Sequence, residues 1–243
     1  VIVLIITAVR IKSMDSHRIS GRILAENIAG PGMLRLVEQS MQARARKTSV
    51  TEIAVKERKH PQAALTFDDG PDIRYTPLLL DGLKERNVRV SFFLLGEKVE
   101  QYPELVERMQ KEGHLVGNHT YHHVQLNKLN ETKVREEILK TNNLIYETTG
   151  VYPLYLRPPF GAWKKNLELC VEMLPVFWTI DTLDWKVQNT EKIVRTVQEQ
   201  IEDGAIILMH DEYDTSVEAA LQVVDELKNQ GYELVTVDQL ILP

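Results

Sequence analysis

Two adjacent carboxylates end an apolar run in this sequence. The segment TFDDGP at 66–71 places Asp68 and Asp69 directly after that run and before a Gly-Pro turn. Successive strand residues point to opposite faces, but a turn at the strand end can bring both side chains into one cleft. Carboxylates this close repel each other unless a cation lies between them or their roles differ. For this segment taken alone, a solvated Asp-Asp turn is the alternative.

Three of the seven histidines lie in one short segment, HTYHH at 119–123. On a helical turn, a spacing of four places His119 and His123 on one face, as metal ligation requires. His122 would point elsewhere and is interpreted as a bystander. Two imidazoles and one carboxylate of the Asp pair make a three-ligand site with open positions. Such a site suits a catalytic divalent ion, zinc first, with cobalt and nickel also compatible. A surface histidine turn is the alternative.

Three more polar segments follow apolar runs, namely RPPFG at 157–161, DTLDW at 181–185 and LMHD at 208–211. Two prolines remove two N–H donors, so the N–H of Phe160 is a candidate dipole toward a developing oxyanion. Arg157 is a candidate partner of an active-site Asp, whereas a lone histidine such as His210 is more often structural. Each segment alone fits an ordinary loop, but five polar segments at five strand ends together indicate an active site.

Short apolar runs alternate with longer amphipathic ones from residue 61 onward. The predicted strands are 63–67, 89–95, 115–118, 154–157, 176–180, 205–209 and 233–237. The predicted helices are 76–86, 103–112, 131–148, 166–173, 190–202 and 216–229. Four of these helices are followed by a glycine where a left-handed cap residue is favoured. These glycines are Gly113, Gly150, Gly204 and Gly231.

Strands that alternate with helices predict an α/β fold with a parallel sheet. Seven such units over 59–243 suit a closed, slightly undersized (β/α) barrel, with a doubly wound open sheet as the alternative. In such barrels the carboxyl ends of the strands carry the active site. The fold would therefore bring the five polar segments to one rim.

Composition narrows the class of protein without naming its chemistry. The net charge of -6 argues against a nucleic-acid partner. The single cysteine, Cys170, excludes an intrachain disulfide and is interpreted as a packed core thiol. Residues 1–9 are almost wholly apolar but too few to span a bilayer. They are interpreted as the cut end of a signal peptide or membrane anchor, with a short buried strand as the alternative. We predict an anchor segment and linker over 1–58 and a catalytic domain over 59–243.

The five segments, in this order, resemble the five motifs of the polysaccharide deacetylase family, carbohydrate esterase family 4. The resemblance covers roughly residues 59–242 and implies a distorted (β/α)7 barrel. It implies that Asp69, His119 and His123 hold the metal ion. It also implies that Asp68 is the general base and His210 the general acid.

The resemblance assigns supporting roles to five further residues. Arg157 would orient Asp68, and Asp184 would tune His210. Phe160 stands where the family usually has Tyr and would act through its backbone N–H. Trp185 and Leu208 would wall the acetyl group.

The implied reaction is metal-dependent removal of N-acetyl groups from an amino sugar polymer, peptidoglycan or a chitin-like chain, with release of acetate. The segment DTLDWK at 181–186 is similar to that of peptidoglycan deacetylases and favours the cell wall. We therefore expect a polysaccharide partner and an extracellular or cell-surface location, with attachment to a membrane through the amino terminus. The alternatives are an O-acetyl esterase acting on acetylated xylan and a catalytically silent carbohydrate-binding homologue. The oligomeric state is not predicted.

Overall fold

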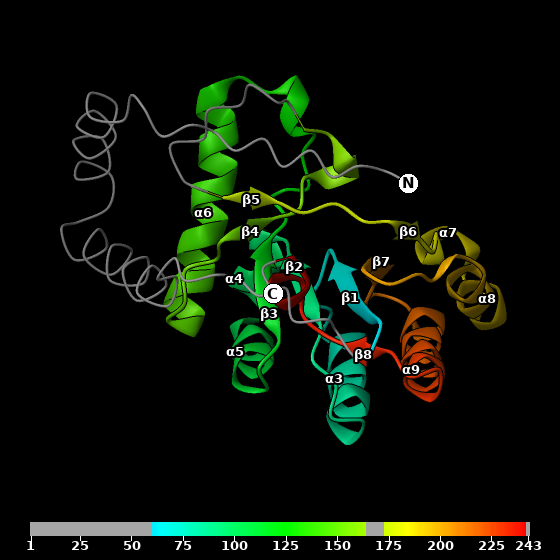
Figure 1. Ribbon diagram of the computed structural model, residues 1–243. Coiled ribbons are helices and arrows are strands. Elements are labelled where there is room, and N and C mark those ends of the chain that lie inside the picture. The colour runs from blue at the N-terminus through cyan, green and yellow to red at the C-terminus, as the bar shows by residue number, and fades with distance from the viewer. Residues whose placement is uncertain (1–59, 164–172, 242–243) are drawn as a thin grey trace, which may run out of the picture. The chain divides into compact units, whose positions relative to one another are not determined.

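The structure, a computed structural model, describes residues 60–163 and 173–241 (Figure 1). The chain divides into the units Val1–Lys56 and Glu57–Pro243, and all described residues belong to the second. The predicted anchor segment, Cys170 and all but the last residue of the predicted helix over 166–173 therefore lie outside the described residues. The predicted division of the chain near residue 58 stays a prediction. None of the helices described in the second unit is long and apolar enough to cross a bilayer.

The second unit is built on a parallel sheet, as predicted. Its ladder runs in the order β5-β4-β3-β2-β1-β7-β6, and β8 pairs with the start of β1. The strands are β1 (Gln62–Asp68), β2 (Ser91–Leu94), β3 (Leu115–Asn118), β4 (Tyr155–Leu156), β5 (Leu174–Pro175), β6 (Ile180–Asp181), β7 (Ala205–His210) and β8 (Glu233–Leu234). Among the described strands, β5 and β6 form the two edges, so the sheet is a distorted, partly open barrel.

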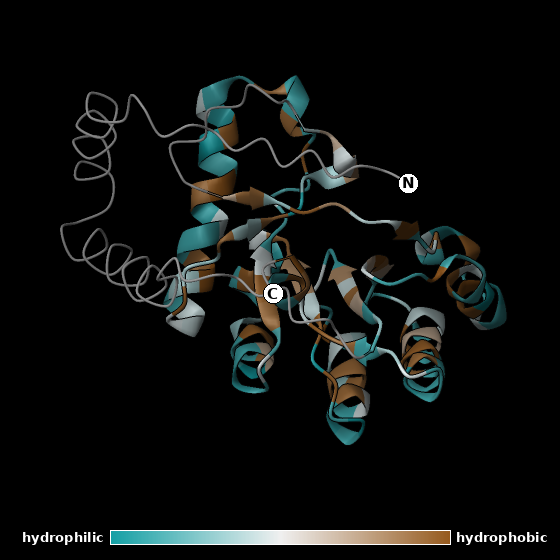
Figure 2. Ribbon diagram, in the orientation of Figure 1, coloured by the Kyte–Doolittle hydropathy of each residue, from teal (hydrophilic) through white to brown (hydrophobic). Residues whose placement is uncertain are grey.

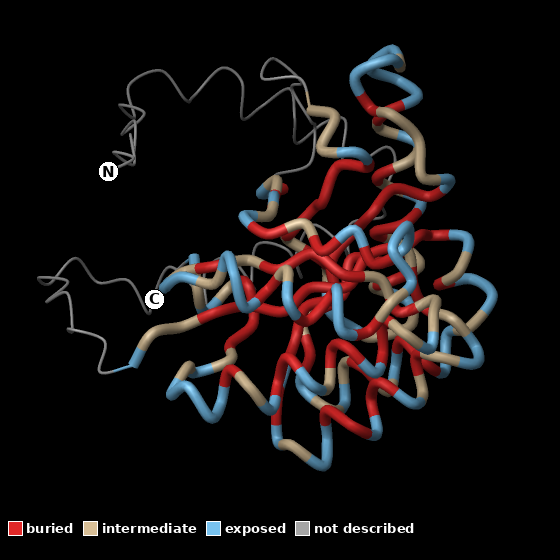
Figure 3. Tube along the Cα trace, turned by 90° about the vertical axis from the view of Figure 1, so that its right-hand side faces the viewer, coloured by how far each residue is buried: buried red, intermediate tan, exposed pale blue. Residues whose placement is uncertain are grey.

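The two faces of β1 and β7 have different surroundings because side chains alternate along a strand. One face belongs to the large core cluster between the sheet and the outer helices. That cluster includes Ala63, Leu65, Phe67, Ala205, Ile207 and Met209. The other face points into the barrel, where Ala64 packs in a smaller cluster with Phe93 and Val237. Buried residues concentrate along the strands, and exposed ones lie on the peripheral helices and turns (Figure 3).

The outer helices present an apolar side to the sheet and a polar side to solvent (Figure 2). The α-helices are α3 (Tyr75–Glu85), α4 (Gly96–Gln101), α5 (Pro103–Lys111), α6 (Glu131–Thr149), α7 (Asp184–Val187), α8 (Thr190–Gln200), α9 (Asp214–Asn229) and α10 (Val237–Ile241). Two 3-10 helices, η1 (Leu126–Lys128) and η2 (Pro159–Gly161), complete the described elements. Gly113, Gly150 and Gly231 have positive φ directly after α5, α6 and α9, which confirms that role. The prediction is wrong for Gly204, because α8 already ends at Gln200 with the extended residue Ile201 as its cap.

The predicted strand over 176–180 is wrong. Its apolar residues are divided between two edges of the sheet. The N–H of Val176 donates to Leu156 O on β4, whereas the N–H of Thr179 donates to Ile206 O on β7. The chain crosses from one side of the barrel to the other between these two bonds, with Phe177 exposed. Hydrophobicity alone could not reveal this division, because both halves are apolar.

Candidate active site

Asp68 and Asp69 lie at the carboxyl end of β1. Asp68 is the last strand residue, points into the barrel and is buried. Asp69 has a left-handed backbone with φ 69°, which breaks the strand alternation. Both carboxylates consequently face one imidazole. His119 Nε2 lies 3.7 Å from Asp68 Oδ2 and 3.4 Å from Asp69 Oδ1.

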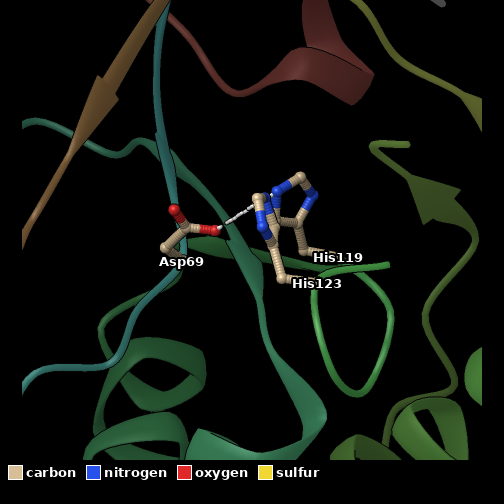
Figure 4. A group of neighbouring side chains, drawn as sticks. All are labelled: Asp69, His119 and His123. Atoms are coloured by element: carbon tan, nitrogen blue, oxygen red, sulfur yellow. Dashed lines mark ion pairs between the residues drawn. The ribbon is translucent and has the colours of Figure 1, made fainter. Parts of the chain in front are cut away.

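His119 and His123 approach Asp69 from the segment after β3 (Figure 4). This segment is not the helical turn that we predicted. Thr120 and His123 both have left-handed backbones, with φ 68° and 55°. These two reversals bring the ring centroids of His119 and His123 to 5.1 Å from each other. His122 lies outside the group, with its Nδ1 2.7 Å from Glu137 Oε1.

Asp69, His119 and His123 have the geometry of a metal site. Their ligand atoms all lie within 4.8 Å of one another. Both His119 Nε2 and His123 Nε2 lie 3.4 Å from Asp69 Oδ1. Ligands about 2.0–2.1 Å from a tetrahedral ion stand roughly 3.3–3.5 Å apart. Asp69 Oδ1 is also buried with no hydrogen-bond partner among the described residues. The donor set therefore fits a divalent cation.

The protonation of these residues also suits a metal ligand set. His119 Nδ1 lies 2.6 Å from the carbonyl oxygen of Arg157, which can only accept, so the Nδ1–H donates and Nε2 is left facing Asp69. Burial alone would raise the pKa of Asp69. The neighbouring imidazoles of His119, His123 and His210 lower that pKa instead. Asp69 is thus ionised at neutral pH, as ligation requires.

Arg157 holds Asp68 from inside the barrel. Its guanidinium is fully buried, and Nη1 donates to Asp68 Oδ1 at 2.8 Å and to Thr66 Oγ1 at 2.6 Å. Burial lowers the pKa of Arg157, although Asp68 opposes that effect. The second oxygen of Asp68 is left to face the metal group. A carboxylate fixed in this way is oriented toward whatever binds beside Asp69.

His210 lies beside Asp68, because these two residues are register partners on the adjacent strands β7 and β1. Asp184, fully buried, accepts from the His210 backbone N–H at 2.7 Å and lies 2.8 Å from His210 Nδ1. His210 Nε2 therefore points toward Asp69 Oδ2, 3.8 Å away. Burial would lower the pKa of His210, but the hydrogen bond and charge of Asp184, with Asp68 and Asp69, raise it to about 9.

The other three predicted residues lie around this group. Phe160, in η2, has a left-handed backbone with φ 60°, and its ring centroid lies 4.5 Å from that of His123. Leu208 is buried on β7, two residues before His210 and therefore on the same strand face. Trp185 is half-exposed on α7, directly after Asp184.

Sequence reasoning missed three residues that contact the site from behind. Thr66 accepts from Arg157 and donates to Ile207 O. Asp211, fully buried beside His210, accepts from the hydroxyl of Thr76. Glu137 accepts from two backbone N–H groups of the histidine segment. Thr66 and Asp211 stand inside the polar segments, so their position was a signal. Glu137 lies mid-helix and carried none.

Comparisons with known proteins agree with this geometry. The family model "Polysaccharide deacetylase" matches residues 55–176. The peptidoglycan-N-acetylglucosamine deacetylase PgdA of Listeria monocytogenes is 42% identical over 185 residues, 76% of this chain and 40% of that protein. A peptidoglycan-N-acetylglucosamine deacetylase of Bacillus cereus is 40% identical over 186 residues, 74% of this chain and 68% of that protein.

A solved structure has the same fold. The peptidoglycan deacetylase PdaC of Bacillus subtilis superposes with a TM-score of 0.73 at 41% identity, covering 75% of this chain and 91% of that one. The present chain spans only about 40% of the length of the Listeria relative. The similarity therefore concerns the unit that carries the site.

Proposed function

The chain belongs to the polysaccharide deacetylase family, and from this premise we propose that it removes N-acetyl groups from peptidoglycan and releases acetate. One observation carries the proposal. Asp68 and His210 are register partners on adjacent strands and flank the Asp69, His119 and His123 group from two sides. A base and an acid on either side of a metal group are the arrangement that hydrolysis of an amide requires.

Asp69, His119 and His123 would hold the cation. Zinc is the first candidate, and cobalt or nickel would suit the same donors. When bound, the ion polarises the acetyl carbonyl and lowers the pKa of a coordinated water. Of the three donors only His119 is buried, whereas the side chains of Asp69 and His123 are 20% and 31% exposed, so the group is accessible to a substrate.

Asp68 would act as the general base. Arg157 occupies one of its oxygens through a hydrogen bond, and the other oxygen faces the metal group. The free oxygen takes a proton from the attacking water as the new carbon–oxygen bond forms. Arg157 fixes the orientation of the carboxylate through this hydrogen bond.

The backbone N–H of Phe160 would stabilise the oxyanion that develops on the acetyl oxygen. A backbone donor needs no hydroxyl on the ring, so the substitution of Phe for the usual Tyr leaves this function intact. The Phe160 ring contacts that of His123, so residue 160 lies next to the Asp69, His119 and His123 group. Trp185 and Leu208 would wall the methyl of the acetyl group.

His210 would donate a proton to the amine nitrogen as the carbon–nitrogen bond breaks. An amine anion is a poor leaving group, so an amide needs this acid more than an ester does. Asp184 fixes the imidazole through Nδ1 and leaves Nε2 as the proton donor. The products are acetate and a sugar with a free amine.

Two observations support a cell-wall substrate and location. The relatives described above are named peptidoglycan deacetylases, and the segment DTLDWK is of the same kind. We propose that the protein acts outside the cell on peptidoglycan. We also propose that residues 1–58 are a targeting segment and linker, the catalytic unit being 59–243.

The direct test is incubation of the purified protein with peptidoglycan, with acetate measured in solution and the fragments analysed by mass spectrometry. We expect acetate release, a mass loss of one acetyl group per modified sugar, and loss of activity after chelation. Acetylated xylan and chitin oligomers, tested in parallel, separate the deacetylase from an O-acetyl esterase. No acetate from any amino sugar polymer would overturn the proposal.

A further inference from the structure

We propose that Glu137 of α6 is a positioning residue that holds the segment 119–123 in its metal-binding conformation. The inference rests on the proposed metal site and concerns a residue outside the five motifs. It assigns Glu137 no contact with substrate or metal. Its effect passes through the backbone that joins His119 to His123.

The histidine segment needs external support because its backbone is unfavourable. Thr120 and His123 are not glycines, yet both have left-handed backbones, with φ 68° and 55°. For L-residues that conformation costs roughly 1–2 kcal/mol each. Thr120 is β-branched, for which a positive φ is particularly unusual. Something in the surrounding structure must offset this cost for the two imidazoles to face Asp69.

Glu137 meets the segment between its two left-handed residues. Its Oε2 accepts from the N–H of Tyr121 at 3.0 Å and from the N–H of His122 at 2.9 Å. Its Oε1 lies 2.7 Å from Nδ1 of His122. One side chain therefore makes three contacts with two consecutive residues. The Glu137 side chain is only 14% exposed, so these bonds are well shielded from water.

Two consecutive N–H groups that point at one oxygen form a concave anion-binding arrangement, which occurs where the backbone turns through a left-handed residue. A carboxylate satisfies both donors, and hydrogen bonds to an ionised acceptor are stronger than neutral ones. Rotation of Thr120 out of its left-handed conformation would turn these N–H groups away from Glu137. The carboxylate thus stabilises the conformation that the ligand pair requires.

The rest of α6 packs so that Glu137 cannot easily move away. Asn118 donates to Ile138 O at 2.9 Å and accepts from the N–H of Thr120 at 2.7 Å, which ties the segment to the next residue of the helix. One turn further on, Lys140 Nζ lies 3.4 Å from the ring centroid of Tyr121. The helix therefore supports the segment along a whole turn, and the side chain of Glu137 accepts from its two backbone N–H groups.

The test compares metal affinity in Glu137→Asp (E137D), Glu137→Gln (E137Q) and Glu136→Ala (E136A). E137D keeps the charge but is one methylene too short to reach both N–H groups. E137Q keeps the length and one carbonyl acceptor. Glu136 is an exposed neighbour on the same helix that pairs with Lys133, so E136A is the matched control. The probes are zinc, in competition with a chelator, and cobalt(II), whose visible absorption reports the ligand geometry.

We expect E137D to bind zinc about ten- to a hundredfold more weakly than the wild type, with an altered cobalt spectrum. We expect E137Q, which keeps the reach but not the charge, to bind zinc with an affinity between those of E137D and the wild type, and E136A to match the wild type. Unchanged zinc affinity in E137D, or an equal loss in E136A, would overturn the inference. These measurements use no substrate. If E137D bound zinc more weakly but the wild-type protein released no acetate from peptidoglycan, the proposed function would be refuted and the inference about Glu137 would stand.

E137D could fail to fold, and a measurement on the wild-type protein covers that outcome. In the metal-free protein, the amides of Tyr121 and His122 should exchange with solvent hydrogen slowly, as donors held by Glu137. Fast exchange at both positions, with slow exchange elsewhere in α6, would overturn the inference.

Discussion

The proposed base and acid of this site are held by different elements from two of the three proposed metal ligands. Asp68 and His210 lie on β1 and β7, and their partners Arg157 and Asp184 are fully buried side chains. His119 and His123 lie at the ends of a loop in which Thr120 and His123 are left-handed, and this loop donates to Glu137 of α6. The sheet itself fixes the distance between groups on adjacent strands. A loop has no such ladder, so its geometry depends on contacts made from outside.

This difference divides the expected effects of substitutions. Changes on the strands should alter the chemical step while the metal stays bound. Changes around the loop should alter metal affinity first and activity as a consequence. The following predictions test that division, from the largest expected effect to the smallest.

The largest effect is expected for Asp68→Asn. The amide keeps the shape of the side chain and can still accept from Arg157, but it cannot take a proton from water. We expect kcat on peptidoglycan fragments to fall about a thousandfold or more. Zinc affinity should stay within a few-fold of the wild type, because Asp68 is not one of the three ligands. Retained turnover would refute its role as base, and lost zinc would break the division between strand and loop.

A second prediction concerns the amino-terminal ends of the strands, opposite the candidate site. His114 precedes β3, is buried, and accepts the N–H of Val90 at its Nδ1, 3.1 Å away. Burial lowers the pKa of His114 to about 4. In the unfolded chain, His114 has an ordinary pKa of about 6.5. Between pH 6.5 and 4 the unfolded protein therefore binds more protons at this residue than the folded protein does. The contribution of His114 to stability should be complete above pH 6.5 and fall by up to about 3 kcal/mol as the pH drops to 4.

The measurement is the free energy of unfolding by urea at several pH values. His114→Asn is the matched variant, because its side-chain oxygen can accept from Val90 but does not titrate in this range. We expect this variant to lose less stability than the wild type between pH 6.5 and 4. Equal pH dependence in the two proteins would show that His114 does not cause the loss of stability at low pH.

Gly70 directly follows Asp69, and its substitution tests how tightly the turn at Asp69 is held. A Cβ at this position would lie 2.4 Å from Asp211 Oδ1 and 2.8 Å from Oδ2. Asp211 is fully buried and cannot swing into solvent. We expect Gly70→Ala to destabilise the fold by about 2 kcal/mol through overpacking, and to weaken zinc binding as Asp69 shifts.

Gly204→Ala is the control for that substitution. Gly204 has a positive φ of 88° but no atom within 4 Å of the new Cβ, so its cost is conformational alone. This control should lose about 1–2 kcal/mol without any change in zinc affinity. Denaturant unfolding and chelator competition measure both quantities. If Gly70→Ala bound zinc normally, the turn would be less rigid than its packing implies.

The same division explains what the sequence could predict. The strand over 115–118 has the predicted bounds, and Gly113, Gly150 and Gly231 lie directly after the helices that they were predicted to cap. Both are local signals, set by an apolar run or by a single residue type. The left-handed backbone at Thr120 and His123 has no glycine to announce it, so the segment was predicted as a helical turn. The contact with Glu137 depends on how α6 packs against β3, which no local pattern reports.

The smallest effect is expected at Phe160. Its backbone is proposed to act in the chemical step, whereas its ring contacts the loop that carries the histidines. Its N–H would serve the reaction, while its 61%-exposed ring contacts His123 of the loop. Phe160→Tyr adds a hydroxyl to an exposed ring and leaves both features in place, so we expect kcat to change by less than about threefold. Phe160→Gly keeps the N–H and tolerates the left-handed φ of 60°, but removes the ring. If the ring supports His123, Phe160→Gly should weaken zinc binding while kcat at saturating zinc falls little. Equal zinc affinity in both variants would assign Phe160 to the reaction alone and leave Glu137 as the principal support of the loop.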